Sequence, residues 1–415
     1  MKNSRSYIAL FWLFVVLNSF FIWGEHKTFI VIFANILVIL FSLMANDSEE
    51  ISLKKVVAIP ILFMTAFVLW SRFRVGTNIF GIIGKLTSLI AFSCLLCWPL
   101  KYIEQTFGLF KKVLVFFCIG SSIISILGAV GLLNSIPHFT LPPQSNLHQR
   151  LGIVYNVYGC FVTINNGSLL LPRACGFLQE PGHFAVIVGL VYLIERTLNR
   201  KRSVSIIIGG IFTFSMNFFI MAFLSEFFKI TNVRQIAKAM RYLLLFVVGA
   251  FFIFSFLPKD IKDQLYFLFW ERNLMEVVDT VQESGSIAEG LNERADDISE
   301  WQYNHLSDEK KLIGIGGLDE DGMLSDFRGI VLTTGYVGLS LSVCSVLSLI
   351  FLSLSWRQRL PLVGAITLIY MHRAWMMNNS MSIYFIVFMA SVLYRLQDEN
   401  LLVSKEIIVK SDREN

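Results

Sequence analysis

Charged residues are scarce in this 415-residue chain: 16% are Asp, Glu, Lys or Arg, whereas 55% are hydrophobic and 38 are Phe. A soluble core cannot account for this composition, because apolar runs of membrane-spanning length recur from Tyr7 to Tyr394. The first run, Tyr7 to Trp23, lacks a small-residue cleavage site and is expected to be an uncleaved anchor. The sequence therefore predicts a polytopic protein of the lipid bilayer, and its net charge of +5 does not indicate nucleic acid as a partner.

Cysteines and cofactor motifs are also few. Six cysteines do not suggest a disulfide framework, and Cys94-x-x-Cys97 lies inside an apolar span with no third ligand nearby. That pair is more typical of a packed helix face than of zinc or redox chemistry. Neither G-x-x-x-x-G-K-[ST] nor H-E-x-x-H occurs. We therefore expect no metal and no cofactor, so energy and electrophile must arrive with the substrate.

Two further cysteines, Cys160 and Cys175, share a loop that we expect outside the cytoplasm, where a disulfide can form. Between them, Asn166-Gly167 is typical of a type I′ hairpin turn. With that turn centred, Cys160 faces Arg173 and not Cys175. The sequence leaves the pairing of the two thiols open.

The apolar runs predict an all-α fold, a membrane bundle of about twelve helices with two large outward loops and both chain ends inside. The expected segments are N-terminal membrane helices over 1–133, a first loop over 134–182, central helices over 183–257, a second loop over 258–328, C-terminal helices over 329–395 and a cytoplasmic tail over 396–415. The individual spans lie near 7–23, 28–45, 53–70, 79–98, 113–133, 183–195, 242–257, 330–355, 360–374 and 380–394, with 203–229 still to be divided.

The segment Ser203 to Lys229 has two readings. One long helix would place the basic stretch from Lys229 to Arg241 on the outer side. Two short helices meeting near Ser215 and Asn217 would return it to the cytoplasm. The excess of Lys and Arg on cytoplasmic loops favours the second reading.

The stretch from Arg173 to His183 sets an arginine and a glutamate before an apolar helix. Pro181 suits the first turn of a helix because it has no N–H and a fixed φ. Counted from there to Glu195, the helix spans only ~22 Å at 1.5 Å per residue, less than the roughly 30 Å of a bilayer core. Its recessed N-terminus, at Gly182 and His183, offers N–H donors and a positive dipole end. This pattern predicts an anion site at the lipid boundary.

The second outward loop, residues 258–328, holds 17 of the chain's 30 acidic residues and seven basic ones. Such a segment is typical of a solvated lid, although Tyr266, Trp270, Trp301 and Tyr303 indicate that parts of it fold. Aromatic faces and carboxylates also suit a saccharide.

Two motifs resemble those of the bacterial O-antigen and capsular polysaccharide repeat-unit polymerases. The first is R-x-x-G-x-x-x-E-P-G, which opens the short helix with Arg173, Gly176, Glu180 and Pro181. The second is Gly314-Ile-Gly316-Gly-Leu-Asp-Glu-Asp321-Gly322 followed by Gly335-Tyr-Val-Gly338. The order of about twelve helices and two large loops is similar as well.

The resemblance implies a glycosyltransferase of the bacterial inner membrane, with its active site and both large loops facing the periplasm. The donor would be a glycan on undecaprenyl diphosphate, and the acceptor a lipid-linked repeat unit. A chain-length regulator in the membrane is a candidate protein partner. Carried over, Arg173 matches the arginine of the first loop. For the second loop the substrate-binding candidates are Arg272, Arg294, Asp321 and Arg328.

The residues support this chemistry independently. Displacing a diphosphate from an anomeric carbon builds negative charge, which the fork of an arginine can meet at two oxygens. The acceptor hydroxyl needs a proton acceptor, for which Glu180 and His305 are the candidates. The structural alternatives are a salt bridge from Arg173 to Glu180 that pins the loop, and an exposed surface role for His305.

Two other functions stay open. An O-antigen ligase uses the same donor but transfers the glycan to lipid A–core, and the chemistry of the residues does not separate it from a polymerase. A lipid-linked oligosaccharide flippase or other carrier would require charges within the spans and repeated halves, neither of which is evident.

Overall fold

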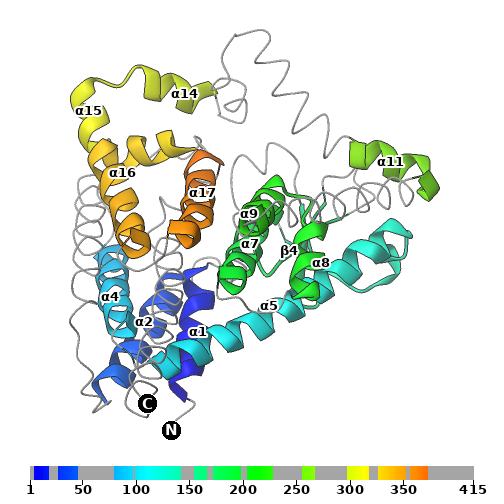
Figure 1. Ribbon diagram of the computed structural model, residues 1–415, viewed down its shortest axis with the longest axis horizontal. Helices are drawn as coiled ribbons and strands as arrows, with labels where there is room; N and C mark the ends of the chain where they lie inside the picture. The colour runs from blue at the N-terminus through cyan, green and yellow to red at the C-terminus, as the bar shows by residue number, and fades with distance from the viewer. Residues whose placement is uncertain are drawn as a thin grey trace, which may run out of the picture. The chain divides into compact units, whose positions relative to one another are not determined.

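Figure 1 shows the computed structural model, which describes residues 4–17, 27–44, 79–96, 98, 100–141, 154–165, 172–197, 203–227, 255–266, 297–316, 326–351 and 356–372. Twelve α-helices hold 78% of these described residues. The helices are α1 (Ser4–Val16), α2 (Lys27–Leu43), α4 (Ile79–Leu96), α5 (Leu100–Ala129), α7 (Pro181–Thr197), α8 (Val204–Phe212), α9 (Met216–Phe227), α11 (Lys259–Tyr266), α14 (Asp297–Asn304), α15 (Asp308–Ile313), α16 (Phe327–Phe351) and α17 (Trp356–His372).

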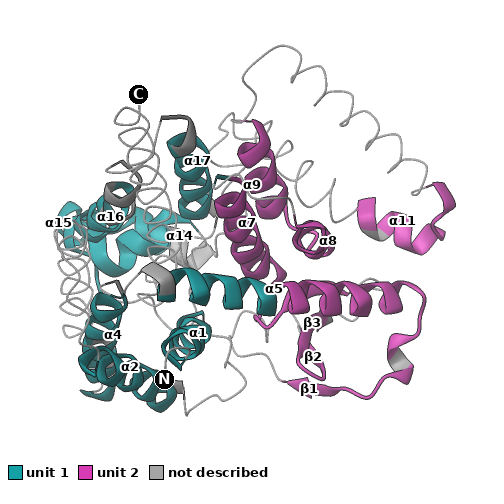
Figure 2. Ribbon diagram, turned by 60° about the horizontal axis from the view of Figure 1, so that its bottom comes forward, with its two compact units in different colours: residues 1–114, 197–201, 295–415 teal, residues 115–196, 202–294 magenta. Residues whose placement is uncertain are grey.

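The chain divides into two compact units, coloured separately in Figure 2. Unit 1 comprises residues 1–114, 197–201 and 295–415, and unit 2 comprises residues 115–196 and 202–294. Helix α5 begins in unit 1 and ends in unit 2.

A four-stranded antiparallel sheet in unit 2 corrects the expectation of an all-α fold, although the predominance of helix is confirmed. Its strands are β1 (Phe139–Leu141), β2 (Val154–Tyr158), β3 (Phe161–Asn165) and β4 (Arg173–Gly176), in spatial order β1-β2-β3-β4. Strands β2 and β3 are rich in the β-branched and aromatic residues that favour strands. Gly159, at φ +65°, supplies the left-handed residue of the two-residue turn between them.

The pairing of β3 with β4 differs from the predicted register. Arg173 lies opposite Ile164 and not opposite Cys160, so the pairing is centred two residues beyond the Asn166-Gly167 step. Asn166 and Gly167 lie outside the described residues. Cys160 is exposed and Cys175 is buried, and both are free thiols, so no disulfide joins them.

The central helices follow the predicted pattern. Helix α7 begins at Pro181, as its missing N–H and fixed φ indicated. The segment 203–229 forms two short helices, α8 and α9, separated by Thr213 to Ser215, so the two-helix reading is confirmed. Helix α5 begins at Leu100 and not near 113 as expected. Lys111 and Lys112 precede the apolar run but lie within the helix and do not mark its start.

Two described helical segments, Tyr102–Ala129 and Phe327–Cys344, are long and apolar enough to cross a membrane by length and composition. Helices α11, α14 and α15 are short and carry charged residues, so the twelve described helices do not correspond to the twelve expected spans. The expected spans 53–70 and 380–394 and most of 242–257 lie outside the described residues.

A buried amide joins three apolar helices of unit 1. Asn35 on α2 accepts a 2.8 Å hydrogen bond from the Trp12 indole on α1 and donates a 2.7 Å bond to the Ser88 hydroxyl on α4. A polar group between apolar helices must find such partners, and the bonds it makes fix which helix faces meet.

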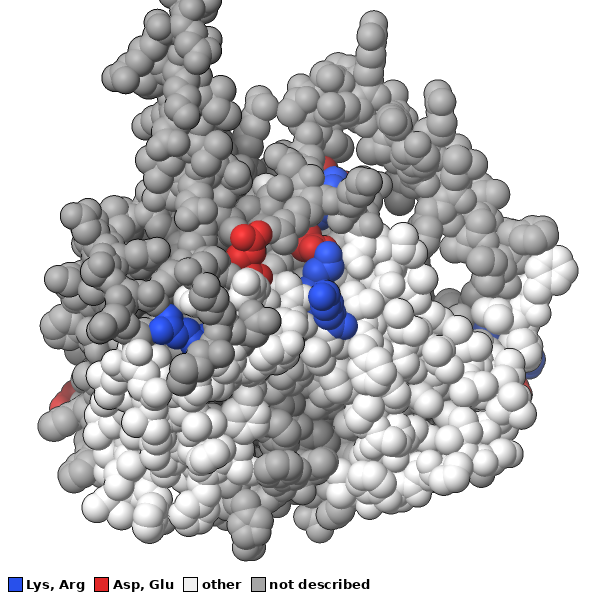
Figure 3. Space-filling view, turned by 90° about the horizontal axis from the view of Figure 1, so that it is seen from below, with Lys and Arg blue, Asp and Glu red and all other residues white. Residues whose placement is uncertain are grey.

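Other faces of these helices expose large apolar side chains at helical spacing. The exposed stripes are Phe29, Phe33, Ile36, Leu40 and Leu43 on α2, Ile79, Ile83, Leu86 and Ile90 on α4, and Phe116, Ile119, Ile123 and Ile126 on α5. On the face drawn in Figure 3, the described residues are mostly uncharged. Contiguous apolar stripes of this kind are unusual in contact with water and mark a surface that something apolar covers.

In unit 1 the two glycine motifs of the sequence meet. Helix α16 is broken at Gly335, which has φ +72° and ψ 179°. In an unbroken helix the carbonyls of Leu332 and Thr333 would accept from residues 336 and 337. Here they accept instead from the backbone N–H groups of Ile315 and Gly316, at 2.8 and 3.0 Å. The G-x-G segment therefore closes the break in α16.

Only glycine allows this approach at Gly335. A Cβ there would lie 2.1 Å from the Leu312 carbonyl oxygen. We predict that Gly335→Ala lowers the thermal unfolding midpoint of the purified protein much more than Gly131→Ala. Gly131 has a similar φ of +74° but open space around it, so its substitution costs only the left-handed backbone penalty of roughly 1–2 kcal/mol. Equal shifts in the two variants would contradict the close packing of α15 on α16.

Candidate functional site

The candidate site in unit 2 lies where β4 leads into α7. Gly176 ends the strand at φ +62°, and a Cβ there would lie 2.3 Å from the ring of Phe184. Glu180 immediately precedes the helix, and its carbonyl accepts the backbone N–H groups of His183 and Phe184 at 3.2 Å each. The motif glycine and the Glu-Pro step thus form a tight strand-to-helix junction against a buried aromatic ring.

Arg173 donates from this junction to the turn between α8 and α9. Its Nε donates to the carbonyl of Thr213, and its Nη2 to the carbonyl of Phe214, both at 3.1 Å. These carbonyls follow the end of α8, where the helix dipole is negative and favours a cation. Phe214 itself is held at φ +47°, an unusual conformation for a residue other than glycine. Arg173 therefore stabilises a strained turn 40 residues away in the chain.

The Glu180 carboxylate lies beside the imidazole of His183, one turn into α7. The Glu180 Oε2 and His183 Nε2 atoms are 3.3 Å apart, and the His183 side chain is 8% exposed. Gly182, between them in the first turn, is also buried. A carboxylate and an imidazole at a helix N-terminus can hold and pass a proton.

The sheet adds two buried groups to this site, which the sequence did not single out as functional. Burial, followed by the nearby carboxylate of Glu180, raises the pKa of Tyr155 on β2. Burial also raises the pKa of the Cys175 thiol on β4, although the Arg173 guanidinium lowers it. Both groups are thus neutral at ordinary pH. The β-branched and aromatic residues of Val154-Tyr-Asn-Val-Tyr158, typical of a strand, were the available signal for Tyr155.

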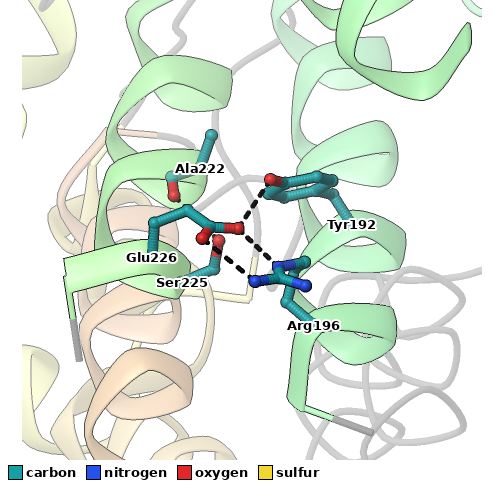
Figure 4. A network of polar contacts seen from close by, with 5 residues as sticks. All are labelled: Tyr192, Arg196, Ala222, Ser225 and Glu226. Carbon is teal, nitrogen blue, oxygen red and sulfur yellow. Dashed lines mark hydrogen bonds and ion pairs between the residues drawn. The ribbon is translucent and has the colours of Figure 1, made fainter. Parts of the chain in front are cut away.

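The far end of α7 is fixed to α9 by the ion pair drawn in Figure 4. Arg196 donates from two guanidinium nitrogens to the two carboxylate oxygens of Glu226, and the Tyr192 hydroxyl donates to the same carboxylate at 2.8 Å. Between the two ends of α7, Gly189 lets Met221 approach so closely that a Cβ would lie 2.7 Å from its sulfur. Helix α7 is thereby held in place along its length.

Unit 1 carries the second group of candidates. Arg328 is buried beside Asp326, whose carboxylate accepts from both the Nε and the backbone N–H of Arg328 at 2.8 and 2.9 Å. The Arg328 guanidinium also lies 5.9 Å from the centre of the Tyr303 ring. The Tyr303 hydroxyl bonds that of Tyr336 at 2.7 Å, and burial together with this bond raises the pKa of Tyr303 to about 12.

His305 differs from the other candidates in its setting. Its side chain is exposed, its Nδ1 lies 2.8 Å from the Trp301 carbonyl oxygen, and its ring stacks on Trp301 with centroids 4.4 Å apart. These local contacts agree with an exposed surface role for His305.

The structure therefore brings five predicted site residues together at one junction of unit 2. These residues are Arg173, Gly176, Glu180, Gly182 and His183. Arg328 and His305 belong to unit 1, and Arg272, Arg294 and Asp321 lie outside the described residues. Among the part of the chain that is described, no three His, Cys, Asp or Glu side chains gather as a metal site requires.

Comparison of the chain with known protein-family models, with characterised proteins and with solved structures finds no match.

The contact of Arg173 with the α8–α9 turn can be tested through Cys118, which is buried on α5 against Gly209 of α8. We predict that Arg173→Ala increases the rate of maleimide modification at Cys118. Each hydrogen bond to a charged group contributes roughly 1.5–3 kcal/mol, and two are lost. Arg173→Lys should give an intermediate rate, since an ammonium lacks the fork. Peptide mass spectrometry measures Cys118 separately from the other thiols, and an unchanged rate in Arg173→Ala would show that α8 is held by other contacts.

Proposed function

We propose that the protein is a membrane glycosyltransferase that polymerises undecaprenyl-diphosphate-linked oligosaccharide repeat units into O-antigen or capsular polysaccharide at the periplasmic face of the bacterial inner membrane. The observation that carries the proposal is the β4–α7 junction. There the residues of the R-x-x-G-x-x-x-E-P-G motif lead into one buried helix, with Arg173 on β4, Glu180 just before α7 and His183 in its first turn.

Several features support placement in a membrane. The exposed stripes of α2, α4 and α5 are apolar over several turns, and two described segments have the length and composition of a membrane span. Helices α8 and α9, of 9 and 12 residues, are about 14 and 18 Å long at 1.5 Å per residue. Neither crosses a bilayer core of about 30 Å, and a pair that turns back within it needs its turn carbonyls bonded by protein. The Arg173 guanidinium supplies these bonds, because it donates to the turn carbonyls of Thr213 and Phe214.

In the proposed reaction, the acceptor hydroxyl oxygen attacks the anomeric carbon of the donor glycan. The new glycosidic bond forms as the bond from that carbon to the diphosphate oxygen breaks, and the diphosphate leaves with the electron pair. Arg173 and the N-terminal N–H groups of α7 stabilise the charge that develops on it.

The proton of the acceptor hydroxyl passes to Glu180, which keeps His183 within ion-pair distance. His305 remains the second candidate for this role, because its exposed imidazole is accessible to a substrate. Arg272, Arg294, Asp321 and Arg328 are proposed to contact the acceptor saccharide from the second loop. A chain-length regulator is the proposed protein partner.

The lipopolysaccharide of a deletion strain tests the function and separates it from its alternatives. We expect core plus a single repeat unit on a gel, because export and ligation continue while polymerisation stops. Core alone would identify a ligase or a flippase instead. An unchanged ladder would exclude all three functions for that polysaccharide, and a plasmid copy of the gene that restores the ladder provides the control.

The role of Glu180 is tested by Glu180→Gln. An amide keeps the size and can still accept a hydrogen bond, but it cannot take up the acceptor's proton at neutral pH. We predict complete loss of polymer with normal abundance of the protein in the membrane. Glu226→Gln is the matched control, a carboxylate-to-amide change in the same unit that keeps one acceptor oxygen for Arg196 and Tyr192. Polymer of wild-type length from Glu180→Gln would restrict Glu180 to a structural role and favour His305.

A further inference from the structure

An apolar groove lies between α5 and the tip of the β2–β3 hairpin in unit 2. Its volume is about 290 Å³, and no polar atom contributes to its lining. The lining residues are Phe116, Ile119, Gly120, Ile123 and Ile124 from α5 and Phe161 from the hairpin. A groove lined only by hydrocarbon and aromatic groups is suited to an apolar ligand, since any polar ligand atom inside it would lose its hydrogen bonds.

The close approach of the hairpin to α5 beside the groove requires a glycine at position 120. The ring of Phe161 lies so close to Gly120 that a Cβ there would be 2.1 Å from it. Phe161 also contacts Phe116 and Phe117, with ring centroids 5.2 and 5.8 Å apart. The Phe161 ring thus packs across Phe116, Phe117 and Gly120 of α5, and the groove lies beside this contact.

The groove opens onto the exposed stripe of α5. Three of its lining residues, Phe116, Ile119 and Ile123, are members of that stripe, and Ile123 is 50% exposed. If the stripe faces lipid, as the proposed function requires, a hydrocarbon chain can enter the groove from the bilayer without crossing water.

A continuous series of aromatic contacts joins the groove to the β4–α7 junction. From Phe161 it passes to Phe117, then to Phe177 at 4.9 Å and to Phe184 at 5.9 Å between ring centroids. Phe177 belongs to the turn that precedes Glu180, and Phe184 lies against Gly176. One apolar layer thus extends from the groove to the residues proposed to bind the diphosphate.

We propose that this groove binds the isoprenoid chain of the lipid-linked donor, next to the diphosphate at Arg173 and the start of α7. This proposal rests on the proposed function. The occupant is assigned as the substrate's chain and not a bulk phospholipid chain, because the aromatic series leads from the groove to the anion site. A chain bound in the groove would fix how far the donor extends into the site.

The test compares Ile123→Trp, which fills the groove, with Ile126→Trp on the same stripe outside it. The two residues are 50% and 48% exposed, so we expect the two substitutions to have similar effects on stability. Purified protein is given donors with a long or a two-isoprene chain. For the long-chain donor we expect Ile123→Trp to raise KM about tenfold with kcat unchanged, because lost apolar contact weakens binding. The short-chain donor should show no difference between the two variants. Equal KM values for the long-chain donor in both variants would overturn the proposal.

A binding measurement that needs no turnover separates this proposal from the proposed function. A diazirine-bearing polyprenyl phosphate should label peptides containing the groove residues in wild type and Ile126→Trp, and not in Ile123→Trp. Unlabelled polyprenyl phosphate should compete, and phosphatidylethanolamine should not. Equal labelling of the variants, or equal competition by the phospholipid, overturns the groove assignment. Specific labelling without turnover of any donor would retain the groove and reject the polymerase.

Discussion

The structure depends on satisfying backbone groups at interrupted apolar helices. Where α8 stops, the carbonyls of Thr213 and Phe214 accept from the Arg173 guanidinium. Where α16 breaks at Gly335, the carbonyls of Leu332 and Thr333 accept from the N–H groups that follow Gly314. A helix can be interrupted in an apolar environment only if protein groups replace the lost bonds, because each unsatisfied carbonyl there is costly. Both sequence motifs supply such a group.

Because of this constraint, the motif residues have structural roles in addition to any contact with a ligand. A substitution at Arg173 or Gly335 alters the path of the backbone as well as any contact with a ligand, so loss of activity alone does not identify a catalytic group. Glu180 differs, because its side chain pairs with His183 while its backbone carbonyl caps α7. A change confined to the carboxylate leaves the cap intact. The chemical and structural roles are therefore separable at Glu180 and combined at Arg173.

Local signals predicted the parts of the fold that local physics determines. Pro181 marked the start of α7, and the positive-inside argument correctly divided 203–229 into α8 and α9. The Asn166-Gly167 step indicated a hairpin between the segments that form β3 and β4, although in another register. Strands β1 and β2 were missed, because hydropathy alone does not distinguish short strands from a loop interrupted by proline. The bond from Arg173 to Thr213 could not be predicted, since its acceptor is a backbone carbonyl and carries no side-chain signature. The close packing of Gly314 against Gly335 likewise could not be predicted, because the two residues come together only in the folded chain.

The described groups of unit 2 suit a ligand with one anionic end and one apolar end. A guanidinium and a helix N-terminus suit an anionic group, and the aromatic series from Phe184 to Phe161 leads from them to a groove without polar atoms. A soluble sugar nucleotide would use the first feature and leave the second exposed. A lipid without an anionic group would use the groove and offer no negative charge to the helix N-terminus. Only a ligand that joins a long hydrocarbon chain to a compact anion fits both, and a polyprenyl diphosphate has that composition. The proposed donor thus agrees with the pattern of the site as well as with the motif.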